Sequence, residues 1–126
     1  MSATNKDRFV CVVDDDEAVR DSTQMLLGIH GFKVRTYAGA HDFLAGFDAS
    51  DTGCLILDIH MPEMTGIELL ALLRTRGIAT PVIIVSGQTD PVVGETLTRS
   101  GALAILGKPV NEGELMGHVE RALASS

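Results

Sequence analysis

Polar side chains with useful chemistry stand where four apolar runs of this 126-residue chain end. In chain order they are Asp14 and Asp15, Asp58, Ser86 and Lys108. Asp58 is the most telling, because it closes the aliphatic run CLIL, and a carboxylate without a partner is costly to bury. Either Asp58 simply begins the loop after a strand, or the strand carries it to a site. Its own segment does not separate these two interpretations.

Short apolar runs alternate with amphipathic segments of helical length along the whole chain. This alternation predicts five parallel strands in one sheet with helices on both faces. Right-handed crossovers favour the strand order 2-1-3-4-5, which is a flavodoxin-like, doubly wound α/β fold in one domain over residues 1–126. The strands are expected at 9–13, 32–37, 54–59, 81–87 and 102–106, with 32–37 at an edge. The five helices are expected over 17–31, over 40–47, over 65–77, after Asp90 and after Asn111.

The first expected helix is amphipathic. Val19, Leu26 and Ile29 should lie on one of its faces, with Met25 beside them, and this face is predicted to cover the sheet. Asp16 is expected to cap the N-terminus of this helix and not to bind metal.

The carboxyl ends of parallel strands meet at one edge of the sheet, where ligands bind in open α/β folds. Asp58 is therefore expected at a site, together with the four other side chains. Converging carboxylates need a cation, and oxygen ligands without a His or Cys cluster favour Mg²⁺. Asp15 is the expected direct ligand, Asp14 a direct or water-mediated one, and Asp58 and the His60 backbone carbonyl supply one oxygen each.

Phosphoryl transfer is the chemistry that this set of groups suits. An aspartate oxygen can attack phosphorus and form an aspartyl-phosphate. Positioning and charge neutralisation matter most in such a transfer. Asp58 is the expected acceptor, while Lys108 and the Ser86 hydroxyl would contact the phosphoryl oxygens.

Composition excludes several other classes of protein. Hydrophobic residues make up 45% of the chain, and the formal net charge is −7, which argues against nonspecific binding to nucleic acid or an anionic membrane. There is no apolar run of membrane-span length and no signal region, so we expect a cytoplasmic location. Cys11 and Cys54 fall inside apolar runs and are expected to be buried, unpaired and free of metal.

Four motifs in this order resemble the receiver domain of bacterial two-component response regulators. They are VVDDDEAVR, LDIHMPEMTG, IVSG and GKP, and the likeness covers nearly the whole chain. The resemblance implies that Asp14 and Asp15 hold Mg²⁺, that Asp58 is phosphorylated, and that Ser86 and Lys108 contact the phosphoryl group. It also implies that the Lys108–Pro109 peptide bond can be cis.

The same resemblance implies partners and a function. A sensor histidine kinase or phosphotransfer protein would be the phosphodonor, and the domain would be a signalling switch, not an enzyme that turns over an external substrate. A homodimer could form through the fourth helix, fifth strand and fifth helix, and this domain would not itself contact nucleic acid. An effector domain such as a helix-turn-helix could follow Ser126. A Mg²⁺-dependent phosphohydrolase with an aspartyl nucleophile and a phosphorylation-independent interaction module are the alternatives; the former should carry an acid where His60 stands.

Ile105 departs from the family pattern, which usually has Tyr or Phe three residues before the strand-five lysine. An isoleucine is stiff at χ1 and has no polar tip. We therefore expect conformational switching to involve mainly the loop after Ser86 and the helix that contains Gly94. The side chain of His60 is expected to face solvent, and Gln88 could position a water molecule or be a plain loop residue.

Overall fold

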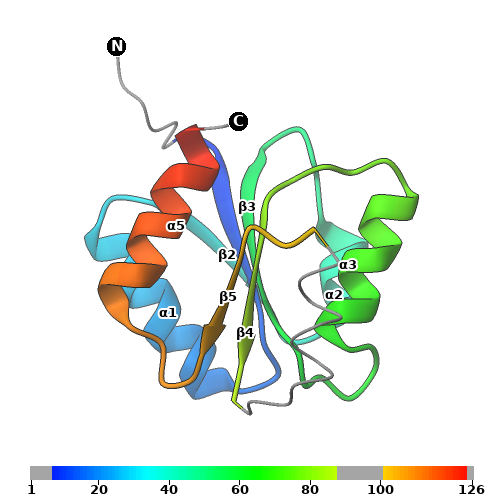
Figure 1. The fold of residues 1–126 in the computed structure, drawn as a ribbon, viewed down its shortest axis with the longest axis horizontal. Coiled ribbons are helices and arrows are strands. Elements are labelled where there is room, and N and C mark those ends of the chain that lie inside the picture. The colour runs from blue at the N-terminus through cyan, green and yellow to red at the C-terminus, as the bar shows by residue number, and fades with distance from the viewer. Residues whose placement is uncertain (1–6, 88–100, 125–126) are drawn as a thin grey trace.

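The computed structural model describes residues 7–87 and 101–124, which form a parallel sheet between two layers of helices (Figure 1). Helices α1 and α5 cover one face of the sheet, and α2 and α3 cover the other (Figure 1). The strands are β1 (Phe9–Val13), β2 (Lys33–Tyr37), β3 (Thr52–Asp58), β4 (Val82–Ser86) and β5 (Ala104–Gly107). The helices are α1 (Glu17–Ile29), α2 (Ala40–Gly46), α3 (Gly66–Thr75) and α5 (Glu112–Ala124).

The order of the strands is β2-β1-β3-β4-β5, and every neighbouring pair is parallel. This confirms the predicted flavodoxin-like topology and the edge position of β2. The predicted ends of the strands are off by at most two residues, since β3 begins at Thr52 and β5 runs from Ala104 to Gly107. The fourth predicted helix, with Asp90 and Gly94, lies outside the described residues, as does Gln88.

Among the described residues, two apolar clusters form the core, one on each face of the sheet. The cluster under α1 and α5 includes Cys54 and Leu27, and the cluster under α2 and α3 includes Cys11 and Phe43. Because the two cysteines point to opposite faces, they cannot pair with each other. Both are free and buried, as predicted, and burial raises the pKa of both thiols.

The predicted inner face of α1 is partly wrong. Leu27 is fully buried, whereas the side chains of Met25 and Ile29 are 68% and 75% exposed. The inner face consists of Val19, Thr23, Leu26 and Leu27, with spacings of four, three and one residues that keep them on one side of a helix. A further step of three from Leu26 to Ile29 turns the side chain toward solvent.

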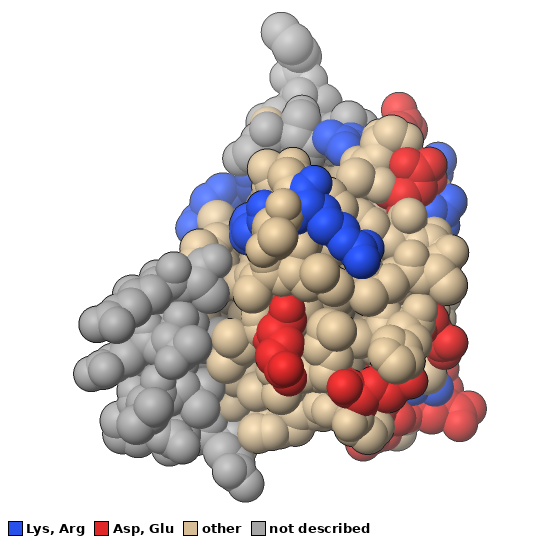
Figure 2. Space-filling model, turned by 90° about the vertical axis from the view of Figure 1, so that its right-hand side faces the viewer, with Lys and Arg blue, Asp and Glu red and all other residues tan. Residues whose placement is uncertain are grey.

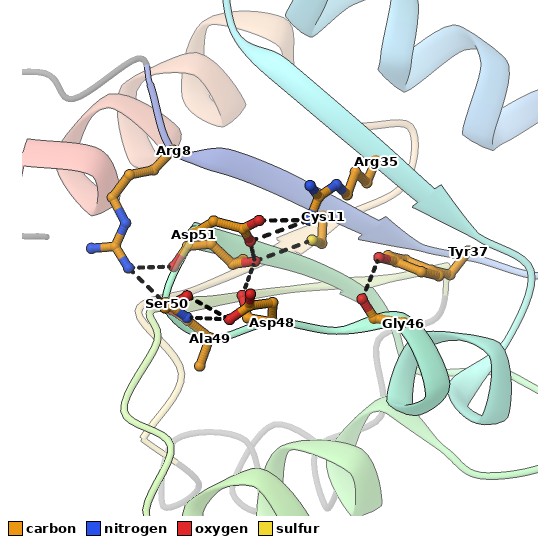
Figure 3. Close-up of polar contacts among 10 residues, drawn as sticks. Arg8, Cys11, Arg35, Tyr37, Gly46, Asp48, Ala49, Ser50 and Asp51 are labelled. Carbon is orange, nitrogen blue, oxygen red and sulfur yellow. Dashed lines mark hydrogen bonds and ion pairs between the residues drawn. The ribbon is translucent and has the colours of Figure 1, made fainter.

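A polar network secures the end of the sheet where β1 and β3 begin (Figure 3). Arg8 donates to the Thr52 carbonyl at 2.9 Å, and Nη1 of Arg35 on β2 donates to both carboxylate oxygens of Asp51 at 3.0 and 3.2 Å. The Arg35 guanidinium also lies 3.7 Å from the centre of the Phe9 ring. These contacts tie the edge strand β2 to the segment that enters β3. In the described part of the chain, none of the helices is long and apolar enough to cross a membrane.

Candidate functional site

The register of the sheet brings the predicted site residues to the same level. Val13, the last residue of β1, pairs with Leu57, and Asp58 pairs with Val85. Ser86 in turn pairs with Gly107, the residue before Lys108. Asp14, Asp58, Ser86 and Lys108 therefore follow one another across the carboxyl edge of four adjacent strands, and these residues come from positions up to 94 apart in the chain.

Three carboxylates gather at this edge. Carboxylate oxygens of Asp14, Asp15 and Asp58 lie within 4.8 Å of one another. Asp14 and Asp58 are buried, with 4% and 5% of their surface exposed, whereas Asp15 is exposed. An oxygen-only set of this kind fits a hard cation such as Mg²⁺, and the exposed side at Asp15 leaves room for water or phosphate oxygens to complete the coordination shell.

Lys108 is the cation that faces the two buried carboxylates. Its Nζ atom lies 3.4 Å from Asp14 Oδ2 and 3.5 Å from Asp58 Oδ1. Burial and the neighbouring charge of Asp14 raise the pKa of Asp58, although Lys108 opposes this. Burial lowers the pKa of Lys108, but the charges of Asp14 and Asp58 outweigh it and raise that pKa. One ammonium against three carboxylates leaves the site with a surplus of negative charge.

Asp14 is held by contacts with the start of α1. Its Oδ1 atom accepts a hydrogen bond from the Asp16 backbone N–H at 2.9 Å. Asp16 caps α1, as predicted, by accepting from the N–H groups of Ala18 and Val19. Arg20 donates to the backbone carbonyl of Asp14 at 2.8 Å. Sequence reasoning missed Arg20, although its position one turn into a helix that follows the acidic pair was a usable signal.

The loop after Asp58 is packed tightly against the start of α3. The Gly66 N–H donates to the Ile59 carbonyl at 3.0 Å, and a Cβ atom at position 66 would clash with the Asp58 carbonyl oxygen. Thr65 and Glu68 form a capping box that fixes the first turn of α3 at this point. The His60 side chain is exposed, as expected, and its backbone N–H lies 3.4 Å from Asp58 Oδ1.

Strands β4 and β5 complete the edge. Ser86 is buried, and its backbone carbonyl accepts a hydrogen bond from the Lys108 N–H at 2.8 Å. The Lys108–Pro109 peptide bond is cis, as the family resemblance implied. Ile105 pairs with the buried Ile84, but 40% of its own surface is exposed. The side chain of Ile105 therefore belongs to the outer surface of β5.

The surface charge is unevenly distributed on the face that carries α3. Acidic and basic side chains occur in both halves of the view, but the red acidic ones prevail in the lower half (Figure 2). The lower end is the one to which the arrows of β4 and β5 point in Figure 1. On this face, acidic side chains therefore prevail toward the carboxyl edge of the sheet, where negative charge attracts cations.

Fold and site together define a doubly wound α/β domain with an acidic edge and a partly buried lysine, Lys108. The sequence model of one protein family, the response regulator receiver domain, matches residues 10–120 of this chain. The chain therefore belongs to the receiver domain family of two-component response regulators, which are phosphorylation-controlled signalling switches.

Known relatives agree with this assignment. The chain is 36% identical over 118 residues to the C4-dicarboxylate transport transcriptional regulatory protein DctR of Rhodobacter capsulatus, covering 92% of this chain and 60% of that relative. The solved structure of the response regulator StyR superposes with a TM-score of 0.85 at 36% identity, over 93% of this chain and 59% of that one. FixJ-N matches with a TM-score of 0.83 at 35% identity, over 94% of both chains. The chain thus spans only about three-fifths of DctR and of StyR.

Proposed function

We propose that Asp58 accepts a phosphoryl group from a phosphohistidine and that this modification shifts the domain between two conformations. The observation that carries the proposal is the position of Asp58, whose buried carboxylate stands at the sheet edge beside Asp14, Asp15 and Lys108. The donor would be a sensor histidine kinase or a histidine phosphotransfer protein. This follows from membership of the family, in which histidine kinases supply the phosphoryl group.

Asp14, Asp15 and Asp58, with the backbone carbonyl of His60, would hold Mg²⁺. When bound, the ion offsets the negative charge of these carboxylates and of the incoming phosphoryl oxygens. Asp15 suits direct coordination because it is exposed, whereas both Asp14 oxygens already accept contacts from Asp16 and Lys108. Two features support this proposal: the ligand atoms are all oxygens, and those of the three carboxylates lie within 4.8 Å of one another.

The covalent step balances with one proton from solvent. An Asp58 carboxylate oxygen attacks the phosphorus, a phosphorus–oxygen bond forms, and the phosphorus–nitrogen bond to the donor imidazole breaks. The leaving nitrogen keeps the electron pair of that bond, and the solvent proton on the imidazole ring lets it leave as neutral imidazole. Lys108 can exchange its contact with Asp58 Oδ1 for a phosphoryl oxygen, because both lie at the same strand end. The Ser86 hydroxyl, one residue beyond the partner of Asp58, would donate to another phosphoryl oxygen.

This chemistry makes the domain a switch and not an enzyme with an external substrate. A phosphohydrolase with an aspartyl nucleophile should carry a second acid two residues after it. That position is His60, whose side chain is exposed. The acyl phosphate on Asp58 would therefore persist long enough to change the conformation of the domain.

The activity of the whole protein is a wider proposal, because several relatives are longer than this chain. DctR is named a transcriptional regulatory protein, so we propose that this receiver controls an output function of that kind. The net charge of −7 argues that the receiver itself does not contact nucleic acid. Exposed Leu103 and Ile105 on and beside β5 support a homodimer that includes the β5–α5 face. A cytoplasmic location follows from the proposed donor.

The test is incubation of the protein with Mg²⁺ and acetyl phosphate, followed by intact-mass spectrometry. We expect a single, alkali-labile phosphoryl group on the native chain and none on Asp58→Asn, because an amide oxygen is a poor nucleophile. Asp42→Asn, at an exposed aspartate of α2, is the matched control and should label normally. Labelling that persists in Asp58→Asn would place the acceptor elsewhere.

A further inference from the structure

A cavity of about 360 Å³ lies between α1 and the segment that connects β5 to α5. Val19 and Leu26 of α1 form one wall, and Val110 and Leu115 form the opposite wall. Ile56 of β3 contributes to the floor. The cavity is open on one side, so a molecule from solvent can reach it.

The lining separates into an apolar body and a polar end. Aliphatic side chains make up most of the walls, while Asp14, Asp58 and Lys108 stand together at one end and already contact one another. The hydroxyl groups of Ser22 and Thr23 on α1 are the uncharged polar groups of the lining. An apolar hollow with a few placed polar groups is the usual form of a small-molecule site.

The volume is sufficient for a ring compound. An apolar cavity of ~150 Å³ is large enough to bind benzene, and this cavity is more than twice that size. Leu26 and Val110, on opposite walls, are only partly buried even though they pack against the core. A molecule between them would remove further apolar surface from water, which favours binding.

Contacts at both ends of α1 hold the walls in place. At the start of α1, Arg20 donates to the Asp14 carbonyl. At its end, His30 Nε2 lies 3.4 Å from Glu112 Oε1, which connects α1 to the first residue of α5. The Asn111 side chain caps α5 by accepting from the Glu114 N–H at 2.9 Å. A cavity between anchored helices is less able to close by collapse of its walls.

We propose that this cavity binds a small, uncharged, mainly apolar molecule of one or two rings that carries one hydrogen-bonding group. The apolar body would lie between Leu26 and Val110, and the hydrogen-bonding group would face the Thr23 hydroxyl. An anionic ligand is disfavoured, because the polar end of the cavity holds more carboxylates than ammonium groups. The inference rests on the cavity and is independent of whether Asp58 is phosphorylated.

The test uses indole, a neutral two-ring molecule with one N–H donor, and indole-3-carboxylate as its anionic analogue. Titration of the ¹⁵N-labelled protein with indole should give saturable amide shifts at residues 18–26, 110 and 115. Indole-3-carboxylate should bind about tenfold more weakly or not at all. Absence of saturable shifts up to the solubility limit of indole would overturn the proposal, and so would equal binding of the two probes.

A cavity-filling variant makes the location testable. Val19→Phe should abolish the indole shifts, because the ring would occupy the hollow beside Leu26. Met25→Phe, on the exposed side of the same helix, should leave indole binding unchanged. Both variants should still be labelled by acetyl phosphate, which shows that they fold and separates this test from that of Asp58. Thr23→Leu is a second filling variant should Val19→Phe fail to fold, and indole shifts that persist in the folded filling variant would refute the assignment.

Discussion

The backbone of Gly66, the first residue of α3, packs directly against the carbonyl group of Asp58. A Cβ atom at position 66 would clash with the Asp58 carbonyl oxygen and would also approach the carbonyl carbon at 3.1 Å. Both atoms belong to the backbone, so neither can move aside as the end of a flexible side chain would. The glycine of the segment MPEMTG therefore fixes the main chain of the proposed acceptor.

Gly66→Ala should destabilise the fold and slow the phosphorylation of Asp58. Forcing one methyl group into a packed region costs ~1–3 kcal/mol, and the displaced Asp58 carbonyl would shift the carboxylate relative to Lys108. Urea unfolding and the rate of labelling by acetyl phosphate measure the two effects. Gly28→Ala is the matched control, because nothing lies within 4 Å of a Cβ atom at this position in α1. The free energy of unfolding of Gly28→Ala should rise by about 0.5–1 kcal/mol, and its labelling rate should be that of the native protein. Equal stabilities and equal labelling rates in the two variants would contradict this role of Gly66.

Asp58→Asn should raise the melting temperature at neutral pH in the absence of Mg²⁺. Burial and the charge of Asp14 raise the pKa of Asp58 in the folded protein above its unfolded value. The folded state therefore favours the protonated carboxyl, and stability is lost as the pH rises through the folded pKa. The asparagine amide does not ionise, so the variant does not lose stability in this way as the pH rises. Asp14 still pairs with Lys108 in the variant.

Melting curves of Asp58→Asn and the native protein at several pH values test this sign. The difference in melting temperature should be greatest at pH 7 and should shrink toward about pH 4, near the unfolded pKa of an aspartate. Asp21→Asn, at an exposed position of α1, should show no such increase. A variant that melts below the native protein at pH 7 would show that the contact with Lys108 outweighs burial and repulsion.

Mg²⁺ should stabilise the native protein, and Asp15→Ala should abolish this effect more completely than Asp14→Ala. Asp15 is exposed and available to the ion, whereas the Asp14 oxygens are engaged by Asp16 and Lys108. Mass action predicts a gain of about 1.4 kcal/mol at ten times the dissociation constant. Thermal melts in MgCl₂, with NaCl of equal ionic strength as the control, provide the measurement. A melting temperature that does not respond to Mg²⁺ would count against the carboxylate site.

Arg35→Lys should weaken the fold without changing the site. The Arg35 Nη1 atom contacts both carboxylate oxygens of Asp51, and the planar guanidinium stacks on Phe9. A lysine ammonium can keep the contact with Asp51 but cannot reproduce the planar stacking. Since the pair is partly exposed, the expected loss is modest, about 0.5–1 kcal/mol. Urea unfolding should show it, and salt should reduce the difference from the native protein. Because this network lies at the opposite end of β3 from Asp58, a changed labelling rate would be unexpected (Figure 3).

The grouping of Asp14, Asp58 and Lys108 could be predicted from sequence because it depends on topology alone. Once parallel strands are recognised, their carboxyl ends must meet at one edge, and residues that follow them become neighbours. The clash that requires Gly66 could not be predicted, because it depends on the path of the loop after Asp58. Leu27 shows a third case. The helix was predicted correctly, but its apolar residues fit two faces, and only packing against the sheet selects one of them.

The last prediction concerns Ile105 and the way in which phosphorylation changes β5. Ile105 is 40% exposed and pairs with the buried Ile84, so its side chain already lies at the surface of an edge strand. Ile105 has no hydroxyl group that could move between an exposed and a buried position, and its β-branched side chain has few rotamers. We therefore expect β5 to move little and the change to run through the loop after Ser86. In the presence of beryllofluoride and Mg²⁺, amide exchange of residues 104–107 should stay close to that of the free protein.

Ile105→Tyr, which restores a ring and a hydroxyl, should change stability by less than about 0.5 kcal/mol but should make the amide exchange of β5 sensitive to beryllofluoride. If residues 104–107 of the native protein reorganise on beryllofluoride binding, this account of switching is wrong, although the proposed role of Asp58 would stand.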